Sequence, residues 1–134
     1  MANYKYKTIV VSDIHLGTEK SWTSEVVHFL RNNHCETLIM NGDIIDGWQL
    51  RKLGRWKRKH TRFFKTLMKL TIENRTTIYY LRGNHDEFLD QIAPLQIMNF
   101  HIRNYLIYKS SGRKYYIVHG DVFDHITSHV SKFR

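Results

Sequence analysis

Residues 37–47 read Thr37-Leu38-Ile39-Met40-Asn41-Gly42-Asp43-Ile44-Ile45-Asp46-Gly47, and this stretch decides the fold. Its first four residues are apolar or β-branched without a charged interruption, which predicts a short strand buried on both faces. The following residues include an amide, two glycines and two carboxylates, which the end of a strand does not need. The carboxyl ends of parallel strands share one edge of a sheet, where ligands bind. The stretch therefore predicts a parallel strand that delivers polar groups to a site.

Two other stretches repeat this pattern. A strand over residues 8–11, also expected to be covered on both faces, runs into Ser12-Asp13-Ile14-His15, and one over residues 77–81 runs into Arg82-Gly83-Asn84-His85-Asp86. Apolar residues at helical spacing predict helices over residues 21–33 and 59–73, and a weaker helix, interrupted at Pro94, after Asp86. The alternation of strands and helices predicts an α/β layered fold with a largely parallel sheet.

The rest of the chain predicts antiparallel pairing. Strands over residues 105–109 and 114–118 flank the turn Ser110-Ser111-Gly112. The second strand runs into His119-Gly120-Asp121, which is a fourth strand end with polar, ligand-type residues. Because no repeat or linker divides the sequence, we expect residues 1–134 to form one domain.

Composition and charge narrow the class of protein. The 134 residues are 42% hydrophobic and 25% charged, an ordinary globular balance, and the single cysteine excludes a disulfide framework and a cysteine-based zinc site. Lys and Arg number 21 against 12 Asp and Glu, so the net charge of +9 predicts an anionic partner such as nucleic acid, a phosphate ester or acidic lipid. Without a secretory signal or an apolar stretch of about 20 residues, a cytoplasmic chain with at most peripheral membrane contact is expected.

The strand ends offer a set of metal ligands. If the strands are adjacent, their ends bring together two carboxylates, two imidazoles and one amide, from Asp13, His15, Asp43, Asn84 and His119. Such a mixed set suits Mn²⁺, Fe or Zn²⁺. A carboxylate such as that of Asp43 can bridge two cations about 3.5–4 Å apart, which together activate water and hold phosphoryl oxygens for in-line displacement.

Each motif alone also has a plain structural interpretation. Asp13 could cap a helix, Gly42-Asp43 and Gly83-Asn84 could be turns, and His119 could be a core histidine. Ligand-type residues at four strand ends of one short chain together favour the site.

The motifs, in this order, resemble those of the calcineurin-like metallophosphoesterases. The resemblance rests on Asp13-Ile14-His15, on Gly42-Asp43-Ile44-Ile45-Asp46 and on Gly83-Asn84-His85-Asp86, with His119-Gly120-Asp121 matching the next histidine motif of the family. More narrowly, residues 12–17, 42–48 and 119–124 look like the UDP-2,3-diacylglucosamine diphosphatase branch. The resemblance implies a layered metallophosphoesterase-like sandwich. It also implies a two-metal phosphoesterase or pyrophosphatase that acts on a UDP-linked acylated sugar of lipid A biosynthesis, at the inner face of the membrane.

The resemblance also implies roles for individual residues. Two divalent ions, with Mn²⁺ favoured over Fe or Zn²⁺, would be held by Asp13 and His15, by the bridging Asp43, and by Asn84 and His119. His85 would face the substrate phosphate as electrophile or general acid, and Asp46 would orient it. Asp86 and Asp124 could support these groups, but no role is assigned to them.

The sequence departs from the family in one respect. A late Gly-His-x-His motif, whose histidines complete both metal sites, is absent. We therefore expect an incomplete sheet and a chain that lacks the C-terminal part of the domain. We also expect weak metal binding, weak or no activity, and apolar sheet surface that is either exposed or buried by self-association.

A basic stretch lies between residues 51 and 62. It holds seven Lys and Arg residues, and Trp48 and Trp56 lie before and within it. A solvated helix start explains these charges, and so does an anion-binding surface for a substrate diphosphate, acidic headgroups or nucleic acid. Arg51, Arg55 and Arg82 are the candidate substrate-binding residues. Two alternatives stay open: a metal-dependent nucleic-acid phosphodiesterase, and a metal-poor chain that only binds anionic partners.

Overall fold

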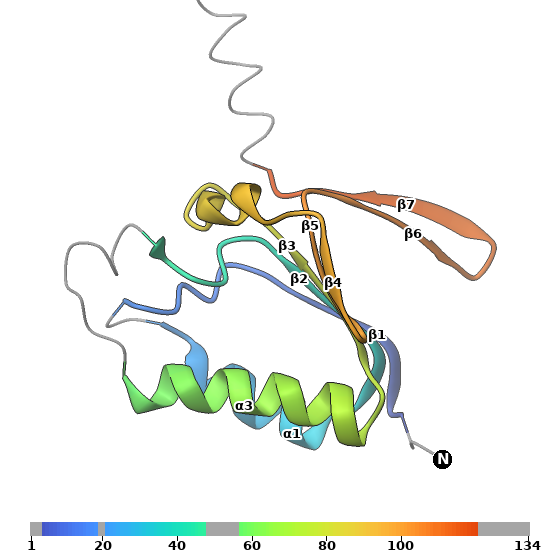
Figure 1. Cartoon of the computed structure of the whole chain (residues 1–134). Coiled ribbons are helices and arrows are strands. Elements are labelled where there is room, and N and C mark those ends of the chain that lie inside the picture. Colours follow the sequence, from blue (N-terminus) through green and yellow to red (C-terminus); the bar gives the residue numbers. More distant parts are fainter. Residues whose placement is uncertain (1–3, 19–20, 48–56, 121–134) are drawn as a thin grey trace, which may run out of the picture.

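The computed structural model describes residues 4–18, 21–47 and 57–120. They form a five-stranded sheet, a two-stranded sheet and a helical layer (Figure 1). The five-stranded sheet has the order β1-β2-β3-β5-β4, with all neighbours parallel except β4 and β5. The elements are β1 (Tyr6–Val11), α1 (Thr23–Asn32), β2 (Cys35–Asn41), α3 (Arg58–Glu73), β3 (Thr77–Leu81), the 3-10 helix η1 (Glu87–Gln91), β4 (Leu95–Ile97), β5 (Phe100–Arg103), β6 (Leu106–Ser110) and β7 (Arg113–Ile117). The predicted α/β fold with a largely parallel sheet is confirmed.

The main core lies between the sheet and the two helices. Phe63 and Leu67 of α3 pack with Leu30 of α1 against Leu38 and Met40 of β2, and all five are at most 1% exposed. Full burial of each such side chain contributes roughly 1.5–3 kcal/mol. This contact fixes the helices on one face of the sheet, as Figure 1 shows.

The other face of the sheet packs against the β6–β7 hairpin. Ile39 and Leu81 contact Leu106 in a second, smaller cluster. Because neighbouring residues of a strand point to opposite faces, β2 is buried on both, as its sequence predicts. Tyr108 of the hairpin is also hydrogen-bonded to Thr8 of β1 through their hydroxyl groups.

The structure corrects three expectations. The first strand is not covered on both faces, because β1 is the outer strand of the sheet, and Val10, opposite the helices, is 56% exposed. The weak helix after Asp86 is a single 3-10 segment of five residues. Beyond Pro94 the chain forms β4 and β5, strands of three and four residues that are too short to show a hydrophobic period.

Candidate functional site

The loops after β1 and β2 are joined by backbone hydrogen bonds that continue beyond the sheet. The Asp13 N–H donates to the Gly42 carbonyl (3.1 Å), and the His15 N–H donates to the Asp43 carbonyl (3.0 Å). Since β1 and β2 are parallel neighbours, these bonds place the first two predicted motifs side by side.

Three of the predicted ligands have left-handed backbone conformations. The φ angles of Asp13, His15 and Asp43 are 56°, 54° and 52°. A residue with a β-carbon loses about 1–3 kcal/mol in this region, and it stays there only where the surroundings fix it. The hydrogen bonds between the two loops supply that constraint.

Asp86 ties the loop after β2 to the loop after β3. Its carboxylate is fully buried and accepts hydrogen bonds from the N–H groups of Asp43 (3.2 Å), Ile44 (3.0 Å) and Gly83. It also accepts from the Tyr80 hydroxyl (2.8 Å). Burial and the neighbouring Asp86 carboxylate raise the pKa of Tyr80 well above its ordinary value, so the hydroxyl stays protonated and donates. Asp86 thus fixes the backbone that carries Asp43.

Asp46 contacts two histidines with one oxygen. Its Oδ2 lies 3.1 Å from His15 Nδ1 and 3.0 Å from His85 Nδ1, and the carboxylate is buried. The two rings meet edge to face, with centroids 4.8 Å apart. An imidazole whose Nδ1 contacts a carboxylate keeps its Nε2 for a metal or a substrate. The structure therefore brings Asp46 to His85, as predicted, and equally to His15.

His119 lies two residues after the end of β7 and completes the cluster. Its Nε2 lies 3.4 Å from Asp43 Oδ2 and 3.7 Å from Asp13 Oδ1, while His15 Nε2 lies 3.6 Å from the same Asp13 oxygen. The Asn84 amide reaches both oxygens of Asp43 at 3.1 Å when its nitrogen faces them. All five predicted ligands converge around Asp43.

The close approach of these loops requires two glycines. A β-carbon on Gly83 would lie 2.3 Å from Asp43 Oδ1, and one on Gly42, whose φ is +80°, would lie 2.3 Å from Cδ2 of His119. Real β-carbons essentially never come that close to another heavy atom. The glycines were expected to allow tight turns, and the neighbouring side chains show why larger residues cannot replace them.

The electrostatics of Asp43 reflect its central position. Burial raises the pKa of this carboxyl above its ordinary value, while the His85 N–H and the charges of His119 and His85 act in the opposite direction. The His85 N–H donates to Asp43 Oδ1 at 2.9 Å. A cation at this position would stabilise the ionised carboxylate.

The donor atoms fit a divalent cation. One ligand atom each from Asp13, His15 and Asp43 lies within 4.8 Å of the others, and the same holds for His15, Asp46 and His85. Carboxylate oxygens and imidazole nitrogens are ordinary ligands of Mn, Fe and Zn. A cation beside Asp43 would favour the opposite orientation of the Asn84 amide, with its oxygen inward.

The structure describes one of the three arginines that were predicted to bind substrate. Arg82 Nε pairs with Asp90 Oδ1 at 2.9 Å, at the start of the loop that carries Asn84. Its role toward a substrate stays a prediction. Arg51 and Arg55 lie outside the described residues.

Sequence reasoning missed two supporting residues. Tyr80 reads as an ordinary strand residue, although its hydroxyl also accepts from the Ile45 N–H (3.2 Å). His60 is 1% exposed, and the N–H groups of Gly17 (3.2 Å) and Lys57 (3.1 Å) face its two ring nitrogens. A neutral imidazole has one acceptor nitrogen, so it bonds one of them at a time. Both residues support site loops from positions distant in the sequence, where no local motif marks them.

The fold and this site define a class of protein, and comparison with known families agrees. The chain belongs to the calcineurin-like phosphoesterase family, whose family model matches residues 6–133. The predicted membership of the metallophosphoesterase family is confirmed.

Among curated proteins the chain is similar to the UDP-2,3-diacylglucosamine hydrolase of Blochmanniella pennsylvanica (strain BPEN). The two are 31% identical over 120 residues, which cover 85% of this chain and 46% of that protein. The chain thus spans about half the length of the curated relative it matches. Among solved structures it is similar to the Pseudomonas putida nuclease MPE, with a TM-score of 0.45 and 17% identity over 78% of this chain and 50% of that one. No helix in the described part of the chain is long and apolar enough to cross a membrane.

Proposed function

We propose that residues 1–134 belong to a single metallophosphoesterase domain, which hydrolyses the phosphoanhydride of a UDP-2,3-diacylglucosamine-type substrate. One observation carries the proposal: ligand-type side chains from four strand ends converge on the buried carboxylate of Asp43. The 31% identical relative and the motif phrases support the nucleotide-sugar substrate. The chain would bind such a lipid-linked substrate at the inner face of the membrane.

The proposal assigns two divalent ions, with Mn²⁺ as the favoured metal. Asp13 and His15 would hold one ion, Asn84 and His119 the other, and Asp43 both. When bound, such ions lower the pKa of a shared water and neutralise phosphoryl charge.

The chain's own residues would handle orientation and protons. Asp46 engages His85 Nδ1 at 3.0 Å, so His85 Nε2 is the atom that donates a hydrogen bond to the phosphoryl oxygen, or a proton to the leaving group. Water adds to phosphorus, the anhydride P–O bond breaks, and the products are UMP and a sugar 1-phosphate.

The test is metal-dependent turnover by the full chain. After treatment with EDTA and addition of Mn²⁺, the wild type is expected to hydrolyse bis(p-nitrophenyl) phosphate, and Asp43→Ala to lose that activity. Glu36→Ala is the matched control, since Glu36 is an exposed carboxylate on β2, the strand that leads into the loop of Asp43. Activity that is unchanged in Asp43→Ala would contradict the proposed metal centre, and absence of activity from the wild type would favour the alternative in which this chain only binds anionic partners.

The substrate is tested separately. Release of UMP from UDP-2,3-diacylglucosamine without cleavage of single-stranded DNA supports the nucleotide-sugar proposal. Cleavage of DNA without release of UMP would replace it by the phosphodiesterase alternative.

A further inference from the structure

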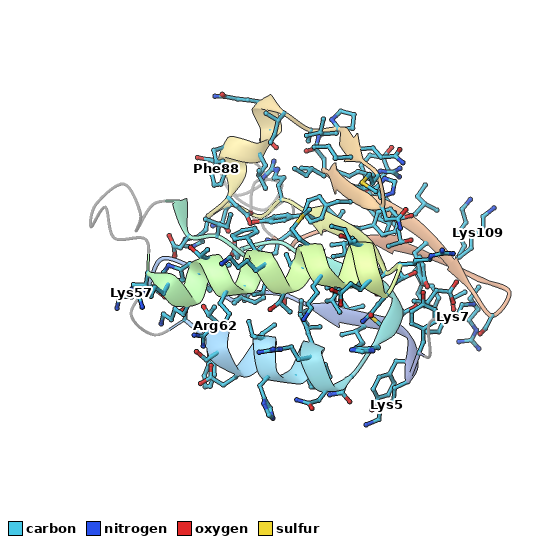
Figure 2. All side chains as sticks on the ribbon, turned by 60° about the horizontal axis from the view of Figure 1, so that its bottom comes forward. Lys5, Lys7, Lys57, Arg62, Phe88 and Lys109 are labelled. Carbon is cyan, nitrogen blue, oxygen red and sulfur yellow. The ribbon has the colours of Figure 1, made fainter. Side chains whose placement is uncertain are left out.

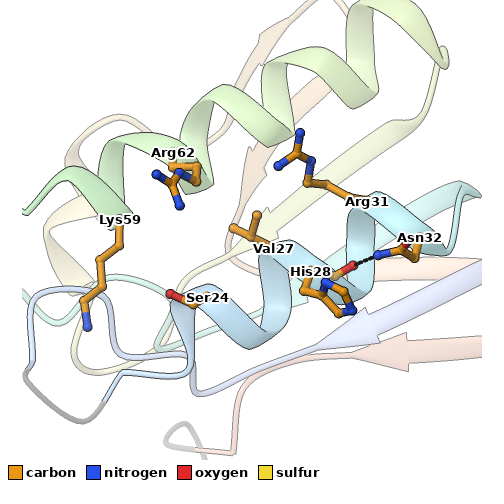
Figure 3. Close-up of a pocket in the computed structure, with 7 residues that line it drawn as sticks. All are labelled: Ser24, Val27, His28, Arg31, Asn32, Lys59 and Arg62. Carbon is orange, nitrogen blue, oxygen red and sulfur yellow. Dashed lines mark hydrogen bonds between the residues drawn. The ribbon is translucent and has the colours of Figure 1, made fainter.

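The outer side of the helical layer carries a groove that the metal centre does not use. Two adjoining cavities of about 480 and 540 Å³ lie along α1 and α3, and both are lined by Arg31 and Arg62. In the close-up of Figure 3, Arg31 of α1 and Arg62 of α3 extend into the space between the two helices. Figure 2 places Arg62 at the same junction. We call this feature the α1–α3 groove.

The groove is strongly basic. Arg31, Lys59, Arg62, Lys65 and Lys69 line it, together with His28 and His34, and Glu73 is the only carboxylate among its lining residues. None of these five cations pairs with a carboxylate of residues 4–18, 21–47 or 57–120. Cations gathered on two facing helices repel one another, and an anion between them would remove that repulsion.

The cations of α3 form a row. Lys59, Arg62, Lys65 and Lys69 follow at intervals of three or four residues, so they share one side of the helix. At 1.5 Å per residue the row is about 15 Å long. One strand of a nucleic-acid duplex places a phosphate every 3.4 Å along the axis, so the row spans about four nucleotides.

The shape and lining of the groove identify the kind of anion. A hollow between two helices admits a chain-like anion and does not fit a flat bilayer surface. The exposed apolar residues of these helices, Phe29, Met68 and Ile72, are not among its lining residues. No Phe, Tyr or Trp side chain, the usual platforms for stacking on bases, lines it. Contacts would therefore be made to phosphates alone and would not depend on base sequence.

We propose that the α1–α3 groove binds the phosphodiester backbone of a nucleic acid, with Arg31 and Arg62 as its central contacts. This binding site is independent of the proposed hydrolysis of a nucleotide sugar. It uses no residue of the metal centre.

The test is the salt dependence of DNA binding by the full chain. A short fluorescein-labelled duplex of mixed sequence is titrated by anisotropy in EDTA, so that ions in the metal centre do not contribute. Losing two phosphate contacts lowers the slope of log K against log salt by about two. Arg31→Gln/Arg62→Gln should show this change, and both residues are exposed, so the fold is preserved.

A matched control has the same change of net charge. Lys109→Gln/Lys114→Gln removes two exposed cations of the β6–β7 hairpin, which lies on the other side of the sheet from the helices (Figure 1). This variant should keep the wild-type slope. Equal losses in the two double variants would overturn the proposal, because binding would then follow net charge alone. The chain could instead bind phosphatidylglycerol vesicles through Arg31 and Arg62 without binding DNA. That result would overturn nucleic acid as the proposed partner of the groove.

Discussion

Replacing Asp86 by asparagine should destabilise the fold far more than a conservative change of one atom suggests. Asp86 is fully buried and accepts from four donors, of which three are backbone N–H groups and one is the Tyr80 hydroxyl. Asparagine replaces one acceptor oxygen by an NH₂ group. The Tyr80 hydroxyl can turn and accept from that group, whereas a backbone N–H cannot.

The magnitude follows from these bonds. One buried N–H without an acceptor costs about 1–3 kcal/mol, and each of the three remaining bonds loses about 1 kcal/mol with the charge. Part of this destabilisation is offset, because the neutral asparagine does not carry the desolvation cost of a buried carboxylate. We expect Asp86→Asn to lower the free energy of unfolding by about 2–4 kcal/mol, a large share of the roughly 5–15 kcal/mol of an ordinary domain.

Urea unfolding followed by far-UV circular dichroism measures this loss. Asp90→Asn is the control, because Asp90 is partly exposed and its pair with Arg82 lies at the surface. Such a pair contributes about 0–1 kcal/mol. If Asp86→Asn loses no more stability than Asp90→Asn, Asp86 does not hold the two loops together as described.

Three further predictions concern single residues. Gly83→Ala should displace Asp43 and abolish the rise in melting temperature that Mn²⁺ causes. Gly120→Ala is the control, because its added β-carbon has no atom within 4 Å, and it should keep that rise. Equal Mn²⁺-induced shifts in melting temperature in the two variants would contradict the role of Gly83. Cys35 is 2% exposed and burial raises its pKa to about 11, so Ellman's reagent should react with it only after unfolding, and rapid reaction in the native state would be evidence against the buried thiol. Burial lowers the pKa of His60 below 6.5, so the unfolded chain binds more protons below that pH and stability should fall as the pH decreases through 6.5 toward the folded pKa. His60→Gln should flatten this part of the stability profile in urea titrations at several pH values, and an unchanged profile would show that His60 is not responsible.

The parallel sheet could be predicted from the sequence because its central strands are continuous apolar runs that are recognisable one by one. Thr77–Leu81 was predicted without error, and the second strand and second helix within two residues of their ends. Strands β4 and β5 were missed, since three or four residues carry no usable period. Exposure of Val10 depends on the strand order, which a single strand does not encode.

The candidate site was predictable for a similar reason. Parallel neighbours bring their carboxyl ends together, so ligand-type residues after successive strands could be placed at one edge. Asp86 lies two residues after the predicted ligand Asn84, but its four hydrogen bonds depend on the mutual position of two loops. The contact of Tyr80 with Ile45 and that of His60 with Gly17 cross 35 or more residues of chain, and no local sequence motif indicates contacts at such a separation.

Binding of Mn²⁺ measured by electron paramagnetic resonance tests the central claim most directly, because free Mn²⁺ gives a signal that bound Mn²⁺ does not. The account predicts that the wild-type chain and Glu36→Ala remove Mn²⁺ from solution alike, and that Asp43→Ala removes far less. Equal binding by Asp43→Ala and the wild type would contradict it, because the side chains gathered around Asp43 would then not be the metal centre.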